Sequence, residues 1–411
     1  MTGQTVVVIG GGQAGYQICA QLRSEGFEGA VHLVAAEPTL PYQRPPLSKA
    51  YLLGKTSAAD LVFRREEFYT TNGIELHLGV TADSIDREER VVQLSTGARL
   101  PYDFVVLATG ARNRPLPVPG AELGNILYLR TIHDTDALKE KLDAAHAVVV
   151  VGGGFIGLEF AAVARILGKD VSVVEMMPRL MARAVPAPVS TFFEELHRGH
   201  GVSLKLGDGV RAIIGDNGLA RRVETSSGQL LDGDLVVVGA GVMPNDDLAK
   251  AAGLAVRDGV MVDLNLRTSD PQVFAVGDCA RFPLPAGGEP IRLESVQNAT
   301  DQARHVARVI VGRADHYDAV PWFWSDQYDV KLQIAGLSQG ADQTVTRGDQ
   351  AAQRFSVFAF KEGRLIAVDS INSAGDHMAA RKLLGAGLSI TPEEAADPAF
   401  DLRAVAKAAG R

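Results

Sequence analysis

The chain has 411 residues, of which 46% are hydrophobic and 22% charged, values typical of a globular protein of two or three domains. Its net charge of −8 argues against a nucleic-acid partner, and no apolar run reaches the roughly 18 residues that span a membrane. The sequence holds only two cysteines, too few for a cysteine-ligated metal cluster, and we expect no metal site. Few cysteines and a start without a basic leader favour the cytoplasm.

The first predicted unit is a strand, a glycine turn and a helix. Residues 5–9 (TVVVI) form the continuous apolar run of a buried parallel strand. The turn 10–15 (GGGQAG) and a helix to about residue 23 follow, and the next strand, 30–34, ends close to Glu37. In such a turn the first glycine makes the tight bend, the second lets the backbone approach a pyrophosphate, and the third permits close helix–strand packing.

The same pattern returns in the middle of the chain. An apolar run at 147–151 leads into the turn 152–157 (GGGFIG), a helix to about residue 167, and a strand that ends on Glu175. One glycine turn alone is a weak signal, because such turns also serve packing. Two turns, each after an apolar strand and each followed by a carboxylate, predict two dinucleotide sites.

Glu37 and Glu175 stand where a dinucleotide-binding fold places the carboxylate that accepts hydrogen bonds from an adenosine ribose. Such a carboxylate also repels a 2′-phosphate, so we expect NADH rather than NADPH at the second turn. Arg179 and Arg183 lie just downstream and would weaken this preference if either reached the phosphate. An exposed loop position is the alternative, above all for Arg183.

Further strands and proline-rich segments set the domain boundaries. A strand at 102–110 ends in a glycine turn, and the run 114–120 (RPLPVPG) has the composition of a linker. A matching strand at 234–238 precedes a second linker near residue 244. The second glycine turn lies between the two linkers, so one nucleotide domain interrupts another.

The order of the features argues that the first site holds FAD. A buried strand at 273–278 returns to the first domain and ends in Asp278, a position suited to a flavin's ribityl chain. The alternative is an aspartate that caps the following turn.

The predicted fold class is α/β, with two Rossmann-like, three-layer dinucleotide-binding domains (FAD and NAD) and a C-terminal α+β domain. In the last domain we expect short alternating strands at 355–360 and 365–368 and a helix near 376–385. The expected boundaries are 1–114 and 245–322 for the FAD-binding domain, 115–244 for the NAD-binding domain, and 323–411 for the C-terminal domain.

Together these features resemble the glutathione-reductase-type flavoprotein superfamily and, within it, the ferredoxin reductases of the putidaredoxin reductase type. The resemblance covers nearly the whole chain. Four motifs carry it: 41–49 (PYQRPPLSK), 154–159 (GFIGLE), 275–280 (AVGDCA) and 321–327 (PWFWSDQ). The first and the last are the most specific.

The resemblance implies roles for individual residues around the flavin. Pro45 would lie against the flavin, Lys49 and Glu159 would form a charged pair near flavin N5 as the catalytic residues, and Trp324 would close the site. Neither member of the pair is assigned an obligatory acid–base role. The full set of expected coenzyme-binding residues is Gly10, Gly12, Ala14, Gly15, Glu37, Arg44, Pro45, Lys49, Ala82, Ala108, Thr109, Gly110, Arg130, Gly152, Gly154, Ile156, Gly157, Glu159, Glu175, Arg183, Gly277, Asp278, Ser295, Val296 and Trp324.

The resemblance also implies a reaction and a partner. NADH would deliver hydride to flavin N5, and single electrons would pass to a two-iron, two-sulfur ferredoxin that serves a haem monooxygenase or a ring-hydroxylating dioxygenase. Segment 41–49 lacks the cysteines that disulfide reductases and NADH oxidases of the superfamily use, so electrons must leave to an outside acceptor. Arg304 is a candidate docking residue for an acidic ferredoxin. We expect a monomer or a weak dimer, without membrane attachment.

Two alternatives stay open from the sequence. One is a related enzyme, a rubredoxin reductase or an NADH oxidase-like protein. The other is a redox-sensing binding protein similar to apoptosis-inducing factor, which shares the paired turns but typically carries extra segments.

Overall fold

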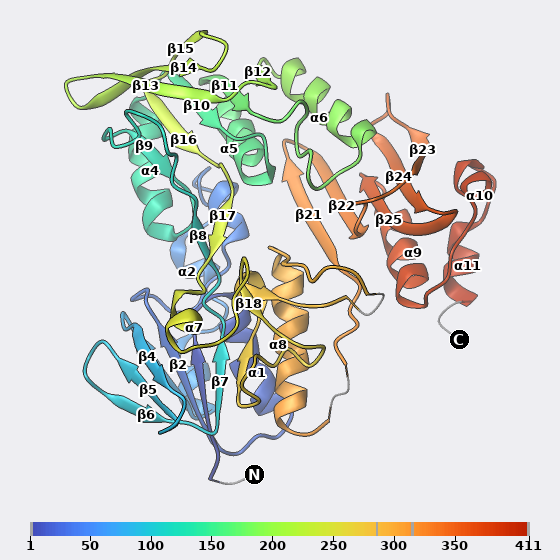
Figure 1. Cartoon of the computed structure of the whole chain (residues 1–411). Coiled ribbons are helices and arrows are strands. Elements are labelled where there is room, and N and C mark those ends of the chain that lie inside the picture. Colours follow the sequence, from blue (N-terminus) through green and yellow to red (C-terminus); the bar gives the residue numbers. More distant parts are fainter. Residues whose placement is uncertain (1–2, 285–286, 314–315, 409–411) are drawn as a thin grey trace. The chain divides into compact units, whose positions relative to one another are not determined.

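The computed structural model describes residues 3–284, 287–313 and 316–408, and the chain divides into two compact units (Figure 1). The first unit comprises Met1–Gln43, Ala58–Arg112 and Val242–Ala319, and the second comprises Arg44–Ser57, Asn113–Gly241 and Val320–Arg411. Both units are assembled from three separate stretches of the sequence. The three-domain boundaries expected from the sequence stay a prediction.

A five-stranded parallel sheet, in the order β19-β7-β1-β2-β3, forms the centre of the first unit. The apolar run of β1 lies between β2 and β7, and its three valines have no exposed surface. Helices α1 and α8 pack against each other (Figure 1). These elements are β1 (Thr5–Ile9), β2 (Ala30–Ala35), β3 (Ile74–Leu78), β7 (Phe104–Leu107), β19 (Val273–Ala275), α1 (Gln13–Ser24) and α8 (Val296–Ile310).

Shorter elements complete the first unit, among them an antiparallel sheet in the order β4-β5-β6. Its strands are β4 (Ala82–Asp86), β5 (Val91–Leu94) and β6 (Arg99–Pro101). The others are α2 (Ala58–Leu61), α3 (Glu66–Thr71), α7 (Asp247–Ala251), β18 (Val260–Met261), the 3-10 helix η2 (Gly277–Cys279) and β20 (Ala280–Arg281). The strands β8 (Ala111–Asn113) and β17 (Val242–Pro244) lie at the points of the sequence where the units change.

The second unit repeats the arrangement in a parallel sheet of the order β12-β11-β10-β16-β9, which confirms the prediction of two similar nucleotide-binding folds. Its elements are η1 (Pro45–Ser48), β9 (Ile126–Tyr128), α4 (Ile132–Ala144), β10 (Ala147–Val151), α5 (Phe155–Ile166), β11 (Asp170–Glu175), α6 (Ala187–Gly199), β12 (Ser203–Leu206) and β16 (Leu235–Val238). A small antiparallel sheet adds β13 (Val210–Asp216), β14 (Leu219–Thr225) and β15 (Leu230–Asp232).

The C-terminal part of the second unit is an antiparallel sheet in the order β21-β22-β25-β24-β23 with three helices, as the α+β prediction required (Figure 1). The elements are β21 (Trp322–Gln327), β22 (Val330–Gly336), β23 (Gln343–Asp349), β24 (Arg354–Lys361), β25 (Arg364–Ile371), α9 (Ala374–Gly385), α10 (Pro392–Ala396) and α11 (Leu402–Ala408). No helix within the described ranges is long and apolar enough to cross a membrane.

The expectation of alternating exposure in this sheet was wrong. Strand β24 is buried at six consecutive positions because both of its faces are covered. Phe358 and Phe360 belong to a hydrophobic cluster with Leu383 of α9. Phe355, on the other face, packs edge-on against Phe192 of α6 at 5.2 Å between ring centroids. This second contact joins the C-terminal sheet to the nucleotide-binding fold of the same unit.

A buried carboxyl group in this sheet makes stability depend on pH. Asp369 on β25 is 1% exposed, neither of its oxygens has a hydrogen-bond partner among the described residues, and burial raises its pKa well above the usual range. The folded state therefore keeps a proton that the unfolded chain releases above pH ~4. Stability must then fall as pH rises through this window, by up to about 1.4 kcal/mol per pH unit until the folded-state pKa is reached.

We therefore expect Asp369→Asn to raise the melting temperature at pH 8, with a gain that shrinks towards pH 4. Thermal unfolding from pH 4 to pH 8 measures this difference. Asp329→Asn, at an exposed position between β21 and β22, is the control and should show no such trend. Parallel pH profiles for the wild type and Asp369→Asn would contradict the assignment.

Candidate coenzyme-binding and redox site

The first glycine turn has the geometry that a pyrophosphate needs. Gly10 has a φ of +121°, and a Cβ there would lie 2.1 Å from the main-chain oxygen of Ala108, so only glycine fits. A Cβ on Gly15 would lie 1.7 Å from the oxygen of Gly10, which is the close helix–strand contact expected of the third glycine. A Cβ on Gly12 would meet no protein atom within 4 Å, and α1 begins here without a side-chain cap. These residues fit a bound dinucleotide.

The second glycine turn has the same properties. Gly152 has a φ of +107° and a Cβ position 2.5 Å from the oxygen of Gly239, while a Cβ on Gly157 would lie 2.2 Å from the oxygen of Gly152. Gly154 again faces open space, and α5 begins without a side-chain cap. The backbone N–H groups at the start of α5 can therefore donate hydrogen bonds to a second pyrophosphate.

Both predicted ribose-binding carboxylates are held in place after their strands. Glu37, which follows β2, accepts a 2.5 Å hydrogen bond from the hydroxyl of Tyr42. Glu175, at the end of β11, accepts hydrogen bonds from the main-chain N–H groups of Gly153 at 2.6 Å and Met177 at 2.7 Å. The bond to Gly153 fixes Glu175 directly beside the second turn.

The two arginines downstream of Glu175 differ in their surroundings. The Arg179 guanidinium donates to the main-chain oxygens of Val185 and Ala182 at 2.7 and 2.8 Å and to the hydroxyl of Ser190 at 2.7 Å. Arg179 therefore holds its own loop together rather than serving a coenzyme phosphate. Arg183 is exposed, and its predicted contact with a coenzyme stays a prediction.

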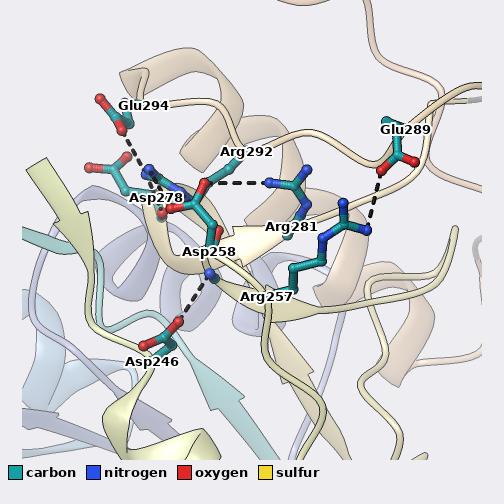
Figure 2. Close-up of polar contacts among 9 residues, drawn as sticks. Asp246, Arg257, Asp258, Asp278, Arg281, Glu289, Arg292 and Glu294 are labelled. Carbon is teal, nitrogen blue, oxygen red and sulfur yellow. Dashed lines mark hydrogen bonds and ion pairs between the residues drawn. The ribbon is translucent and has the colours of Figure 1, made fainter.

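A network of ion pairs and hydrogen bonds holds the main chain at Asp278 in place (Figure 2). Arg292, with a side chain only 9% exposed, donates to the main-chain oxygen of Asp278 at 3.2 Å and to Glu294 at 2.7 Å. It also lies 3.5 Å from Asp258, which pairs with Arg281 at 3.4 Å. The network orients the turn after β19, and with it the carboxylate expected to bind the ribityl chain.

The remaining predicted residues of the first unit, apart from Ala82 in the antiparallel sheet, lie after the parallel strands or in the helices α1 and α8. Gly277 packs closely against Ala14 of α1 and Ala299 of α8, each Cβ lying 3.4 Å from a Cβ placed on the glycine. Its N–H donates to Gln302 at 2.7 Å, and Ser295 caps α8 by accepting from Asn298. The other members are Ala108, Thr109 and Gly110 after β7, Ala82 at the start of β4, and Val296 at the start of α8.

The second unit brings Lys49 and Glu159 together, as expected for the implied catalytic pair. Their Nζ and Oε2 atoms are 2.7 Å apart, and the Glu159 side chain is 6% exposed. Two hydroxyl groups share the carboxylate: Ser48 donates to Oε2 and Ser325 to Oε1, each at 2.7 Å. Every oxygen of this buried carboxylate thus has a donor, which is what a stable buried charge requires.

A chain of buried polar groups continues from Glu159 into the core of the second unit. The Gln327 amide donates to the Ser325 hydroxyl at 3.3 Å, and its oxygen lies 2.8 Å from Nε2 of His197 on α6. Burial lowers the pKa of His197 to about 4, so the imidazole is neutral at pH 7 and Nε2 is the donor to Gln327. His197, Gln327 and Ser325 in turn fix the orientation of Glu159.

Four further predicted residues lie in the second unit. Arg44 donates to the main-chain oxygen of Arg130 at 2.7 Å, so these two expected flavin contacts adjoin. Pro45 opens η1, and its carbonyl accepts from Lys49 at 3.4 Å. Ile156, in the first turn of α5, is an apolar side chain left 44% exposed, as expected if a coenzyme covers it. Trp324 lies on β21 beside the ring of Trp322.

Comparison with known proteins places this arrangement in a family. Residues 4–303 match the model of the pyridine nucleotide-disulphide oxidoreductases, and residues 322–406 match the reductase C-terminal domain. The chain belongs to the pyridine nucleotide-disulphide oxidoreductase family. It is 48% identical to rhodocoxin reductase of Rhodococcus erythropolis over 399 residues, which cover 97% of this chain and 93% of that protein.

Two solved structures are similar over almost the entire chain. A ferredoxin reductase of Rhodopseudomonas palustris superposes with a TM-score of 0.96 at 48% identity, covering 98% of this chain and all of that one. Putidaredoxin reductase in its covalent complex with putidaredoxin superposes with a TM-score of 0.95 at 38% identity, covering 100% of both chains.

The sequence did not predict the residues that hold the site residues in place. Tyr42, Ser48 and Ser325 lie inside the motifs that carried the resemblance. Only the structure shows that Tyr42 donates a hydrogen bond to Glu37 and that both serines donate to Glu159. A serine next to Lys49 and a serine in an aromatic strand were the available signals. Arg292 gave no signal, because its role depends on main-chain contacts.

Proposed function

We infer that this protein is an NADH-dependent, FAD-containing ferredoxin reductase of an oxygenase system. The observation that carries this conclusion is the likeness over nearly the full length, C-terminal domain included, to reductases named for rhodocoxin, a ferredoxin and putidaredoxin. When bound, FAD would supply the chemistry of taking up hydride from NADH and passing on its electrons one at a time to the ferredoxin. The partner serves a haem monooxygenase or a ring-hydroxylating dioxygenase.

The residues of the chain bind and orient the two coenzymes. We assign FAD to the first glycine turn with Glu37 and Asp278, and NADH to the second turn with Glu175. Lys49 supplies positive charge for the reduced flavin, and Glu159 holds Lys49 in position at 2.7 Å. Trp324 closes the site. The polar chain through Ser325 and Gln327 keeps Glu159 from rotating away.

The cysteines offer the electrons no alternative route. The sequence has two, Cys19 and Cys279, and both are fully buried thiols in the first unit. Burial raises the pKa of Cys19 to about 12, so its thiolate is not formed at neutral pH. Segment 41–49 contains no cysteine or methionine. Its Ser48 hydrogen-bonds to Glu159, and its Lys49 forms an ion pair with the same carboxylate. Free thiols also support a reducing compartment, and we propose the cytoplasm.

The decisive experiment measures NADH-driven cytochrome c reduction with and without a two-iron ferredoxin, alongside oxygen uptake. A large ferredoxin-dependent increase with little oxygen uptake is the expected result. Rapid ferricyanide reduction without any ferredoxin-dependent increase would contradict the proposal and favour rubredoxin or another acceptor.

Arg304 is the residue we propose for ferredoxin docking. Its side chain is 53% exposed on α8, and its ion pair with Asp301 is long, at 3.8 Å, so its charge remains available to an acidic protein. Arg304→Glu should slow ferredoxin reduction at low salt by about tenfold and leave ferricyanide reduction unchanged. Arg198→Glu on α6 is the matched control, since Arg198 is 51% exposed and also has a helical acidic partner. Equal ferredoxin rates for the two variants would argue against docking at Arg304.

A further inference from the structure

Three side chains converge at the edge of the parallel sheet in the first unit, away from the glycine turn. His32 lies on β2, and Glu75 and His77 lie on the edge strand β3. The parallel register places His32 opposite Glu75, and residues two apart on a strand share a face. Nδ1 of His32 lies 3.2 Å from Nε2 of His77, and the Glu75 carboxylate oxygens lie 3.3 and 3.4 Å from these nitrogens.

These distances are those of a metal-binding face. In a tetrahedral zinc site with bonds of about 2.0–2.1 Å, any two ligand atoms are about 3.3–3.4 Å apart. The three observed separations match this edge length, and the two that involve Glu75 end on its two different oxygens, Oε2 for His32 and Oε1 for His77. Either oxygen can therefore serve as the third ligand. The two histidine side chains are 15% and 17% exposed, while Glu75 is 63% exposed. The protein thus holds the imidazoles in place, and the open corner is accessible to solvent.

Hydrogen bonding gives one account of this arrangement. A proton on each facing nitrogen would let His32 donate to Oε2 and His77 to Oε1 of Glu75, with the two nitrogens 3.2 Å apart. A metal ion gives the other account, because it uses the lone pairs of both nitrogens and of the carboxylate at once. Titration with Zn²⁺ distinguishes the two.

We propose that His32, Glu75 and His77 form a site for a divalent transition-metal ion of the zinc class, with water at the open position. Two imidazoles and one carboxylate suit zinc and its neighbours rather than magnesium or calcium, which prefer sets of oxygen ligands. The ion would tie the edge strand β3 to β2, the strand that leads to Glu37. The 45-residue separation of the histidines explains why no motif in the sequence marks the site.

The test uses the FAD-loaded protein after treatment with a chelator. Calorimetric titration with Zn²⁺ alone should show about one site per chain, and zinc should raise the melting temperature because it binds the folded state. Mg²⁺ should do neither. The buried cysteines do not compete for zinc in the folded protein.

Two variants decide whether the binding belongs to this site. Glu75→Gln and His77→Ala should each bind zinc at least about tenfold more weakly and lose the thermal shift. His133→Ala, at an exposed position on α4, is the control and should bind as the wild type does. Glu75→Gln changes an exposed side chain, so it decides the matter even if His77→Ala folds poorly. Zinc affinity unchanged in Glu75→Gln, or no binding by the wild type, would overturn the proposal, and neither result bears on the reductase activity.

Discussion

Gly12→Ala is expected to give a folded protein that has lost most of its FAD. A Cβ at this position meets no protein atom within 4 Å, and the backbone φ of −84° is one that alanine adopts readily. The added methyl group therefore disturbs only what approaches the turn from outside. We expect the FAD dissociation constant to rise at least about tenfold, which corresponds to about 1.4 kcal/mol. The ratio of flavin to protein absorbance after gel filtration, with circular dichroism for the fold, measures the effect.

Gly154→Ala is the matched variant at the second turn. Its Cβ also meets nothing within 4 Å, so we expect normal folding and a full complement of FAD. The KM for NADH should rise about tenfold or more, with ferricyanide turnover nearly preserved at saturating NADH. Loss of FAD from Gly154→Ala together with its retention in Gly12→Ala would reverse our assignment of the two turns.

Gly10→Ala shows what a change to the fold itself would look like. Its Cβ would lie 2.1 Å from the main-chain oxygen of Ala108 at a φ of +121°. The clash is between the added Cβ and main-chain atoms of Ala108 and Thr109, which cannot move aside as a flexible side chain can. This variant should therefore be recovered poorly or not at all. The contrast between Gly10 and Gly12 separates steric need within the protein from space kept for a ligand.

The features that the sequence predicted well are local ones. A glycine turn between an apolar strand and a helix carries its whole geometry within a few residues, so both turns and the carboxylates that follow them could be placed in advance. The buried runs at β1 and β10 were equally clear, because a strand covered on both faces shows as an unbroken apolar run. The alternating exposure expected for strand β24 was wrong because one of its two faces is covered by α6. That helix lies more than a hundred residues earlier in the sequence, so the local pattern did not indicate it.

The features that the sequence did not show depend on contacts between distant segments. Glu159 is surrounded by groups from Ser48 and Ser325, which are 111 residues before and 166 residues after it. His197 reaches the same site only through Gln327, 130 residues away. A buried carboxylate demands such donors, but the chemistry alone does not say which residues supply them. The resemblance named the pair, and the structure shows which groups hold it in position.

Removal of the charge on Glu159 tests whether the pair acts in hydride transfer. Glu159→Gln preserves the shape, and the amide can keep its oxygen towards Lys49 and turn its NH₂ towards the Ser325 hydroxyl, which is able to accept. What is lost is the charge that holds Lys49. We expect flavin reduction at saturating NADH to slow by about a hundredfold, a loss typical of a preorganised charged group. Anaerobic stopped-flow bleaching of the flavin band measures this rate directly.

Lys49→Met should slow the same step to a similar degree, and the double variant should be no slower than either single one. The two effects are not additive if Glu159 contributes only by positioning Lys49. Once Lys49 is replaced, the loss of Glu159 has no further effect on the rate of flavin reduction. Ser325→Ala is the control for a purely structural effect, because it removes one hydrogen bond to Glu159 and leaves both charges. Its rate should fall only a few-fold. If Glu159→Gln reduced its flavin as fast as Ser325→Ala does, the carboxylate would hold the local structure, and the charge of the pair would have no part in hydride transfer.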